Sequence, residues 1–98
     1  VASVAAMTAA CSRPAPRRHT ITVRNFAFVP AELSVSPGDT IVWSNADFVP
    51  HTATASDRSW DSRSIDANGS WRFVARTAGR HGYYCAFHPT MKATIVVR

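Results

Sequence analysis

Apolar and polar residues alternate with a period of two in several short segments after residue 18. The clearest runs lie at 20–24, 33–36, 40–44, 71–73, 81–85 and 95–97. Alternation over about four to eight residues is typical of a strand with one buried face. Turn residues such as Pro37-Gly38-Asp39 and Asn68-Gly69 separate the runs, and no window has the apolar spacing of an amphipathic helix. The pattern predicts an all-β antiparallel sandwich.

The first eighteen residues have a different composition. Residues 1–10 are small and mostly apolar, and 12–18 contain two prolines and three arginines. The apolar part is too short to span a bilayer but resembles the end of a secretory signal. The small residues before Cys11 also resemble a lipoprotein processing site, although Thr8 departs from that pattern; an export signal cleaved nearby is the alternative.

The composition change sets the expected domain boundary. We expect a tail and linker over 1–18 and one folded domain over 19–98. We also expect a periplasmic or extracellular location, with attachment to a membrane through a lipidated Cys11 if the lipoprotein interpretation holds.

Length, composition and charge narrow the class of protein. The chain has 98 residues, of which 46% are hydrophobic and 17% charged, as expected for a single globular domain. The net charge is +5, but three of the eleven basic residues are in the tail. No basic patch or nucleic-acid reading motif accompanies the charge, so we expect no nucleic-acid partner. A monomer is expected.

The last third of the chain contains three metal-ligand types at regular spacing. Cys85, His88 and Met91 follow one another at intervals of three residues beside a predicted strand. Residues three apart in a strand point to opposite faces, so binding one ion requires the chain to curl. Pro89 interrupts a sheet ladder and is expected to enforce a loop there. Two nitrogens, one thiolate and a weak axial thioether are the donors of a blue-copper centre.

The second nitrogen must come from another part of the chain. His19 follows two arginines in the tail and is expected to be solvated. His81 lies four residues before Cys85, about 13 Å along an extended strand, and is expected to be a core histidine that needs a hydrogen-bond partner. His51 follows Pro50 in a separate loop that can return to Cys85. We therefore expect His51 to be the second nitrogen ligand.

Two other interpretations of these residues are weaker. The two cysteines, Cys11 and Cys85, could form a disulfide, since disulfides are common in small secreted chains, but Cys85 lies among other metal-ligand types. Structural zinc sites favour more thiolates and no methionine.

At these residues the sequence resembles the cupredoxins, most closely the amicyanin and plastocyanin group. One matching stretch runs from Phe28 to Asn45 and is followed by His51; the other runs from Ala78 to Val97 and contains the ligand spacing. The resemblance covers nearly everything from Thr20 to Arg98. It implies an eight-stranded Greek-key β-sandwich.

The resemblance also implies roles for particular residues. His51, Cys85 and His88 would be the strong copper ligands, and Met91 the weak axial ligand. The backbone N–H of Thr52 would bond the ligand sulfur; the family usually has Asn there, and the threonine hydroxyl would supply a shorter bridge between the ligand loops. The Asn45 amide would help to order the ligand loop.

These features lead to an expected function. The chain would be a blue-copper protein that carries single electrons between Cu(II) and Cu(I), with redox proteins docking transiently near His88. The expected docking rim is made of Phe48, Val49, Pro50, Phe87, Pro89 and Thr90. The alternative is a periplasmic copper-delivery protein that transfers the ion and not the electron. An enzyme with Cys85 as nucleophile is not expected, because the chain is small and has no evident substrate cleft.

Overall fold

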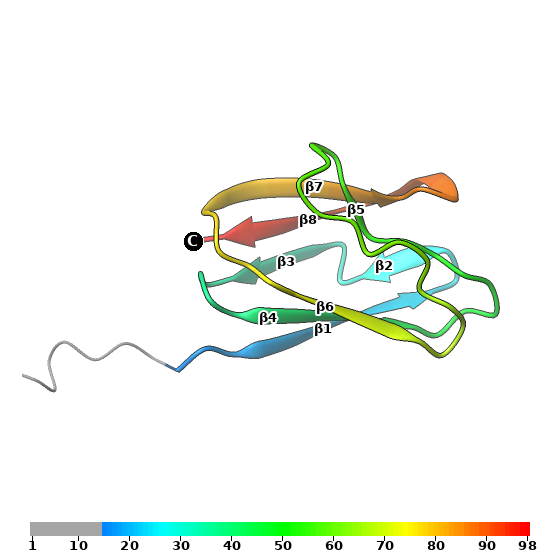
Figure 1. Cartoon of the computed structure of the whole chain (residues 1–98), viewed down its shortest axis with the longest axis horizontal. Helices are drawn as coiled ribbons and strands as arrows, with labels where there is room; N and C mark the ends of the chain where they lie inside the picture. The colour runs from blue at the N-terminus through cyan, green and yellow to red at the C-terminus, as the bar shows by residue number, and fades with distance from the viewer. Residues whose placement is uncertain (1–14) are drawn as a thin grey trace, which may run out of the picture.

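The computed structural model describes residues 15–98 and has no helix among them. It contains eight strands, which Figure 1 shows in chain order. They are β1 (Arg18–Arg24), β2 (Ala27–Val29), β3 (Glu32–Val35), β4 (Thr40–Asn45), β5 (Thr54–Ala55), β6 (Ser70–Val74), β7 (Gly79–Cys85) and β8 (His88–Val97). The predicted all-β class is confirmed. The last residue of the expected linker, Arg18, already belongs to β1.

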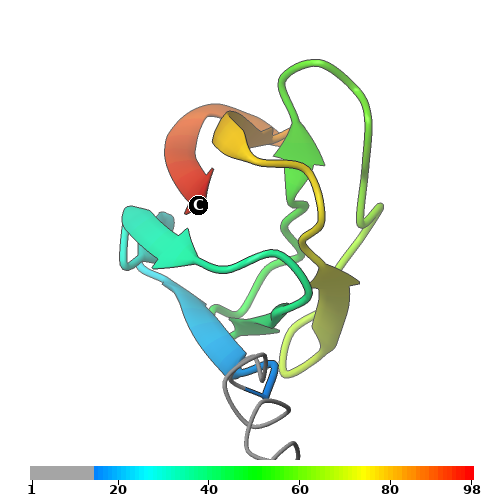
Figure 2. The ribbon, with the colours of Figure 1, turned by 90° about the vertical axis from the view of Figure 1, so that its left-hand side faces the viewer.

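The strands form two four-stranded sheets that pack face to face (Figure 2). One sheet has the order β2-β1-β4-β6 and the other β3-β8-β7-β5. The chain crosses from one sheet to the other several times, as a Greek-key sandwich requires. The prediction that the sandwich is antiparallel was wrong in part, because β1 pairs with β4 and β3 with β8 in parallel.

The alternating sequence produces the buried faces of these strands. In β1, Ile21 and Val23 have no exposed surface, whereas Thr20 before them and Arg24 after them are exposed and Thr22 between them is partly exposed. Trp43 and Tyr83 are the largest fully buried side chains, and their ring centroids lie 5.6 Å apart across the two sheets. Burial of such rings supplies a large share of the hydrophobic stabilisation of a domain of this size.

Two histidines outside the ligand motif have structural contacts. The prediction that His19 is only solvated was wrong: its Nε2 lies 2.8 Å from Asp39 Oδ2, and the side chain is 21% exposed. His81 shares a face with Tyr83 and donates from Nε2 to the Thr77 carbonyl at 2.7 Å. The expected partner of His81 is therefore present, but the ring is only partly buried and lines a cavity of about 400 Å³.

The two ends of the sandwich differ. The β1–β2 turn, the loop after β4 and the β7–β8 turn lie together at the right-hand end in Figure 1, and the C-terminus lies at the left-hand end with the β3–β4 turn. The predicted ligand segments thus gather at one end. Within residues 15–98 no helix has the length and hydrophobicity needed to cross a membrane.

Candidate metal centre

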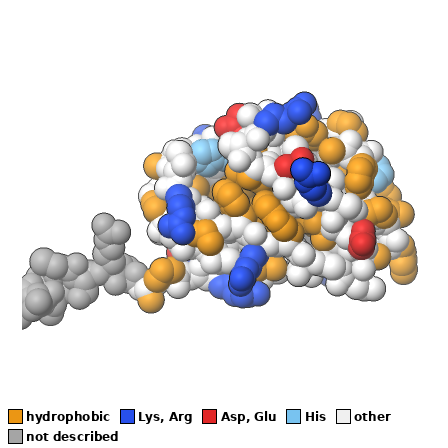
Figure 3. All heavy atoms as spheres, in the orientation of Figure 1, with side chains coloured by type: hydrophobic (Ala, Val, Ile, Leu, Met, Phe, Trp, Pro, Cys, Tyr) orange, Lys and Arg blue, Asp and Glu red, His pale blue; other side chains and the backbone are white. Residues whose placement is uncertain are grey.

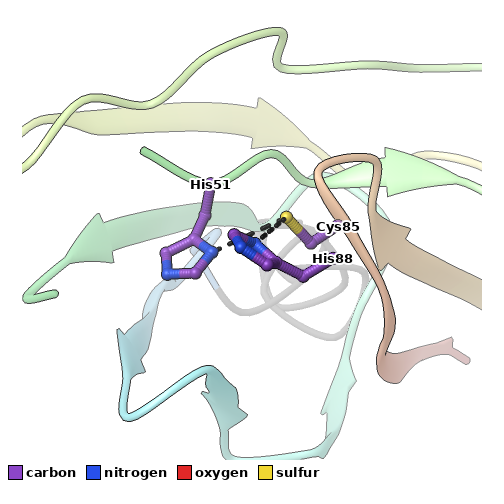
Figure 4. Close-up of side chains that lie close together, drawn as sticks. All are labelled: His51, Cys85 and His88. Atoms are coloured by element: carbon purple, nitrogen blue, oxygen red, sulfur yellow. Dashed lines mark hydrogen bonds between the residues drawn. The ribbon is translucent and has the colours of Figure 1, made fainter. Parts of the chain in front are cut away.

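Three side chains from two separate segments converge at the right-hand end of the sandwich. His51 follows β4, Cys85 is the last residue of β7, and His88 is the first residue of β8. One ligand atom from each lies within 4.8 Å of the others. Figure 4 shows the two imidazoles pointing toward the sulfur.

Both histidines present the same ring nitrogen to Cys85. The Nδ1 atoms of His51 and His88 lie 3.6 and 3.7 Å from Cys85 Sγ. Cys85 and His51 have no exposed surface, whereas His88 is partly exposed. Among the described residues Cys85 is a free thiol. Cys11, the partner in the weaker disulfide interpretation, lies outside the described residues.

A two-residue turn at 86–87 brings Cys85 and His88 together, and the β7–β8 ladder is irregular beside it. Cys85 pairs with His88, but the next residue back, Tyr84, pairs with Lys92. Residues 89–91 are therefore extra residues on β8 at this point, which is a bulge that bends the strand. The curl that the spacing requires is present. Ala86 and Phe87 form the turn between β7 and β8, outside the strands as predicted, whereas Pro89 lies inside β8 in the bulged part and not in a loop.

Met91 lies within this bulged part of β8. Its side chain is 5% exposed and belongs to the buried core cluster that also contains Cys85. Its thioether is a soft, weak donor type, and its role as the axial ligand stays a prediction.

Thr52 contacts the Cys85 segment through both its backbone and its side chain. Its N–H donates to Cys85 Sγ at 3.3 Å, and its Oγ1 accepts a 2.7 Å hydrogen bond from the Ala86 N–H. The hydroxyl lies 2.9 Å from Thr54 Oγ1, which donates to Asp61 Oδ1 at 3.1 Å. Because Thr54 donates to the carboxylate, Thr52 donates to Thr54. The two ligand segments are thus joined through a threonine.

Asn45 orders the loop that carries His51. Its buried Nδ2 donates to the carbonyls of Val49 and Ile65, both at 2.9 Å. Its Oδ1 accepts a 2.9 Å hydrogen bond from the Asp47 N–H. The amide therefore fixes the backbone before His51 and connects it to Ile65, the residue that pairs with His51.

Asp47 is a site residue that the sequence interpretation missed. Its Oδ2 lies 2.8 Å from His51 Nε2. A carboxylate only accepts, so Nε2 carries the proton and Nδ1 presents its lone pair toward Cys85. Burial opposes ionisation of Asp47, but hydrogen bonds from Phe26, His51 and Asn25 outweigh it and hold the pKa of the carboxyl below its usual range. The only signal in the sequence is an acid four residues before the histidine.

Phe26 is the second residue that was missed. Its ring meets the His51 and His88 rings edge to face, with centroids 5.3 and 4.9 Å away. The side chain is 51% exposed, so it lies between the two imidazoles and solvent. No periodicity or spacing in the sequence connects this residue with the ligands.

All six residues of the expected docking rim are exposed. Phe48 is fully exposed, Phe87 is 51% exposed and Val49 is 36% exposed. Figure 3 shows hydrophobic side chains gathered at the right-hand end of the molecule, where these loops lie. Exposed apolar groups that gather at one end of a small protein are typical of an interaction site.

The donor set fits copper. Two imidazole nitrogens that face one sulfur, with a thioether nearby in the sequence and buried, are soft and intermediate ligands. A structural zinc site is expected to contain more thiolates. Asp47 orients the His51 ring and Phe26 packs against both imidazoles, so the donor atoms of His51, Cys85 and His88 already face one another.

Comparison with known proteins agrees with this chemistry. Residues 1–97 match the family model described as a cupredoxin-like domain. Amicyanin from Paracoccus versutus is 18% identical over 82 residues, which is 79% of this chain. The aligned part spans 62% of that amicyanin, so the chain covers less than two thirds of this relative.

Solved structures share the fold. A purple cupredoxin from Nitrosopumilus maritimus has a TM-score of 0.77 at 24% identity, covering 82% of this chain and 99% of that one. The oxidised state of an amicyanin variant has a TM-score of 0.77 at 22% identity, covering 83% and 82%. A copper-containing nitrite reductase from Thermus scotoductus has a TM-score of 0.76 at 23% identity, covering 89% of this chain and 23% of the enzyme. The chain belongs to the cupredoxin-like family, and the cofactor of its centre is copper.

Proposed function

We propose that this protein is a single-electron carrier whose copper ion is held by His51, Cys85, His88 and Met91. The observation that carries the proposal is the approach of two imidazole Nδ1 atoms to one buried thiol, at 3.6 and 3.7 Å. When bound, copper would supply a centre that gains and loses one electron between Cu(II) and Cu(I).

The protein's part is to hold the ligands still. His51 is held by Asp47, Cys85 accepts from the Thr52 N–H, and His88 pairs with Cys85 at the start of β8. Ligands held by a packed core change position little between oxidation states, and small reorganisation favours fast electron transfer. The same rigidity disfavours a role in handing the ion to another protein.

His88 is the proposed exit for the electron. It is the most exposed of the proposed ligands: His51 and Cys85 have no exposed surface and Met91 is buried. The apolar rim around it would provide the docking surface for redox proteins. Small apolar faces suit transient encounters, because they bury little area and release quickly.

Copper loading tests the proposed centre. Adding Cu(II) to the purified metal-free protein should produce an intense visible absorption and the EPR spectrum of a blue-copper site. Cys85→Ser should abolish both, because the thiolate–copper bond is lost. A colourless copper complex in the unchanged protein would contradict the assignment.

Redox cycling separates a carrier from a delivery protein. A carrier keeps its copper through repeated reduction and oxidation in the presence of a Cu(I) acceptor. Loss of Cu(I) to the acceptor within a few cycles would favour ion transfer.

The similarity to nitrite reductase covers 23% of that enzyme and shows a shared fold, so we propose no enzymatic activity.

The location of the protein is part of the proposal. We propose export to the periplasm or cell exterior, with residues 1–18 as a tail and linker and 19–98 as the copper domain. Cys11, the proposed lipidation site, lies outside the described residues. Mass spectrometry of the protein from membrane and soluble fractions would identify a lipid on Cys11; an unmodified chain in the soluble fraction alone would contradict the anchor.

A further inference from the structure

The β1–β2 turn places an aromatic residue where glycine is usually found. Arg24 pairs with Ala27, so Asn25 and Phe26 form a two-residue hairpin loop. Both have positive φ, 50° and 57°. A loop with positive φ at both positions is most often Asn-Gly, because a bulky side chain is strained in this region. Strained residues that persist often mark a functional site.

The strained conformation directs the Phe26 ring over the metal centre. The ring lies edge to face against both imidazoles, at interplanar angles of 89° and 88°. The His51 and His88 ring centroids are 5.1 Å apart, so one phenyl ring spans the pair. Half of the Phe26 side chain is exposed. The ring therefore covers an edge of the site that solvent would otherwise reach.

One carboxylate holds both the turn and a ligand. Asp47 Oδ1 accepts from the Asn25 N–H at 2.6 Å, and Oδ2 accepts from the Phe26 N–H at 2.9 Å. The same Oδ2 is 2.8 Å from His51 Nε2. The Asp47 side chain is 11% exposed, and Asn45 Oδ1 holds its backbone N–H. Three donors from two segments thus meet on one group.

We propose that Asp47 is a positioning residue that ties ligand His51 to an aromatic cover, Phe26, so that one carboxylate sets both the ligand orientation and the shielding of the metal site. This inference rests on the proposed copper centre for its functional meaning. The contacts themselves belong to the metal-free protein, so they can be tested separately from copper chemistry.

Replacement of Asp47 by asparagine cannot preserve all three hydrogen bonds. An amide has one acceptor oxygen and one NH₂ donor. If its oxygen keeps the Phe26 and His51 bonds, its NH₂ faces the Asn25 N–H; if it turns, it loses both Phe26 and His51. Asp47→Glu keeps the charge and both acceptor oxygens on a longer side chain, so it should preserve part of the hydrogen bonding that Asp47→Asn loses.

The first experiment uses the metal-free protein and NMR. In Asp47→Asn, we expect the amide protons of residues 25 and 26 to exchange about tenfold faster, because each loses a charged acceptor or the turn that holds it. Cross-peaks from the Phe26 ring to the His51 and His88 rings should weaken. Asp66→Asn is the matched control, since Asp66 is an exposed carboxylate that accepts from Ser64 Oγ. Unchanged exchange and unchanged ring contacts in Asp47→Asn would overturn the proposal.

The second experiment uses the copper-loaded protein and a Cu(I) chelator. Phe26→Gly should keep the turn, because glycine suits the positive φ, and its melting temperature should be unchanged or higher. The chelator should nevertheless remove copper from Phe26→Gly about tenfold faster than from the unchanged protein. In Asp47→Asn, removal should also be faster, and the affinity for copper should fall by about 10- to 100-fold. Asn25→Gly, which changes the same turn but keeps the ring, is the control and should behave as the unchanged protein.

The outcomes separate the two proposals. Equal chelation rates in Phe26→Gly and the unchanged protein would show that the ring is not a cover and would overturn the inference. If the unchanged protein forms no blue-copper site, the proposed function fails, whereas the NMR experiment still decides whether Asp47 holds the turn and His51 together.

Discussion

Thr52 contributes to the metal centre through two groups with different tolerance to change. Its N–H bond to Cys85 Sγ depends on the backbone and survives most substitutions. Its hydroxyl lies between the Ala86 N–H and Thr54 Oγ1, and only a side chain that both donates and accepts can replace it. The family resemblance implies asparagine at this position, so this chain bridges the ligand segments with a shorter group.

We expect Thr52→Val to destabilise the protein by about 1–3 kcal/mol, because valine has a similar shape but leaves the Ala86 N–H without its acceptor. Thr52→Ser keeps the hydroxyl and should retain most of the stability. Urea unfolding of both variants measures the difference. Equal stability of the valine and serine variants would show that the hydroxyl bridge contributes nothing.

Tyr83 is a buried polar residue whose hydroxyl we expect to add nothing to stability, in contrast to the hydroxyl of Thr52. Its hydroxyl and the Trp43 indole N–H are both buried, and neither makes a hydrogen bond of good geometry in the described part of the chain. Burial raises the pKa of the phenol far above its usual range, and the neighbouring Trp43 N–H opposes the shift only in part. Tyr83→Phe removes a buried polar group and keeps the ring packing, so the free energy of unfolding should stay the same or rise by about 1 kcal/mol. A large loss of stability in urea unfolding would reveal a partner for the hydroxyl.

Single residues show what the sequence could and could not reveal about the site. Cys85 and His88, which the structure brings together with His51, were recognisable because a short segment with three donor types is rare; the axial role of Met91 stays a prediction. Asp47 and Phe26 were not recognisable, because their roles arise from contacts between a hairpin turn and a distant loop. Such contacts depend on how two strands end beside each other, and no local pattern records that.

At the scale of elements, Asp39 joins three segments at the end opposite the metal centre. Its carboxylate accepts from the N–H groups of Arg17 and Ser36 and pairs with His19. The start of β1 is thereby fixed to the turn between β3 and β4.

This junction predicts a dependence of stability on pH. Hydrogen bonds from Arg17, Ser36 and His19 lower the pKa of Asp39 from 3.8 to about 2. A depressed pKa favours the folded state when the carboxyl is ionised, so the stabilisation is complete above about pH 4 and is lost as the pH falls toward 2. Asp39→Asn should be less stable than the unchanged protein at pH 6, and the difference should shrink between pH 4 and 2.

Urea unfolding of the metal-free protein at several pH values measures that difference. Asp66→Asn, which removes an exposed carboxylate elsewhere, provides the comparison and should follow the unchanged protein. A constant gap between Asp39→Asn and the unchanged protein across this pH range would show that the junction does not depend on ionisation.

The elements themselves were largely predictable. Period-two alternation located β1, β4, β7 and the end of β8, since one face of each packs on the core. The direction of pairing was not predictable, because alternation is the same in parallel and antiparallel strands. The bulge in β8 was also missed; the sequence showed that the chain had to curl, and a proline suggested a loop where the structure has a bent strand.

At the scale of the whole molecule, the sandwich separates its functional end from its chain ends. The ligands, the Phe26 cover and the docking rim lie at one end, whereas the start of β1 and the C-terminus lie at the other (Figure 1). A carrier attached to a surface through its N-terminal side would thus present the metal end outward. The net charge of +5 does not define this face, because the exposed groups there are mainly apolar.

This separation of the two ends predicts that a charge introduced by mutation affects electron transfer only when it lies at the metal end. Two copies that exchange an electron through His88 must bring their rims together, so Phe87→Glu should slow self-exchange about tenfold by repulsion between the copies and loss of water from a carboxylate at an apolar contact. Ala78→Glu adds the same charge at the opposite end and should exchange electrons at the original rate. NMR line widths in mixtures of oxidised and reduced protein measure the exchange, and the visible spectrum of both variants should stay unchanged. Equal rates for the two variants would place the electron's exit away from the rim.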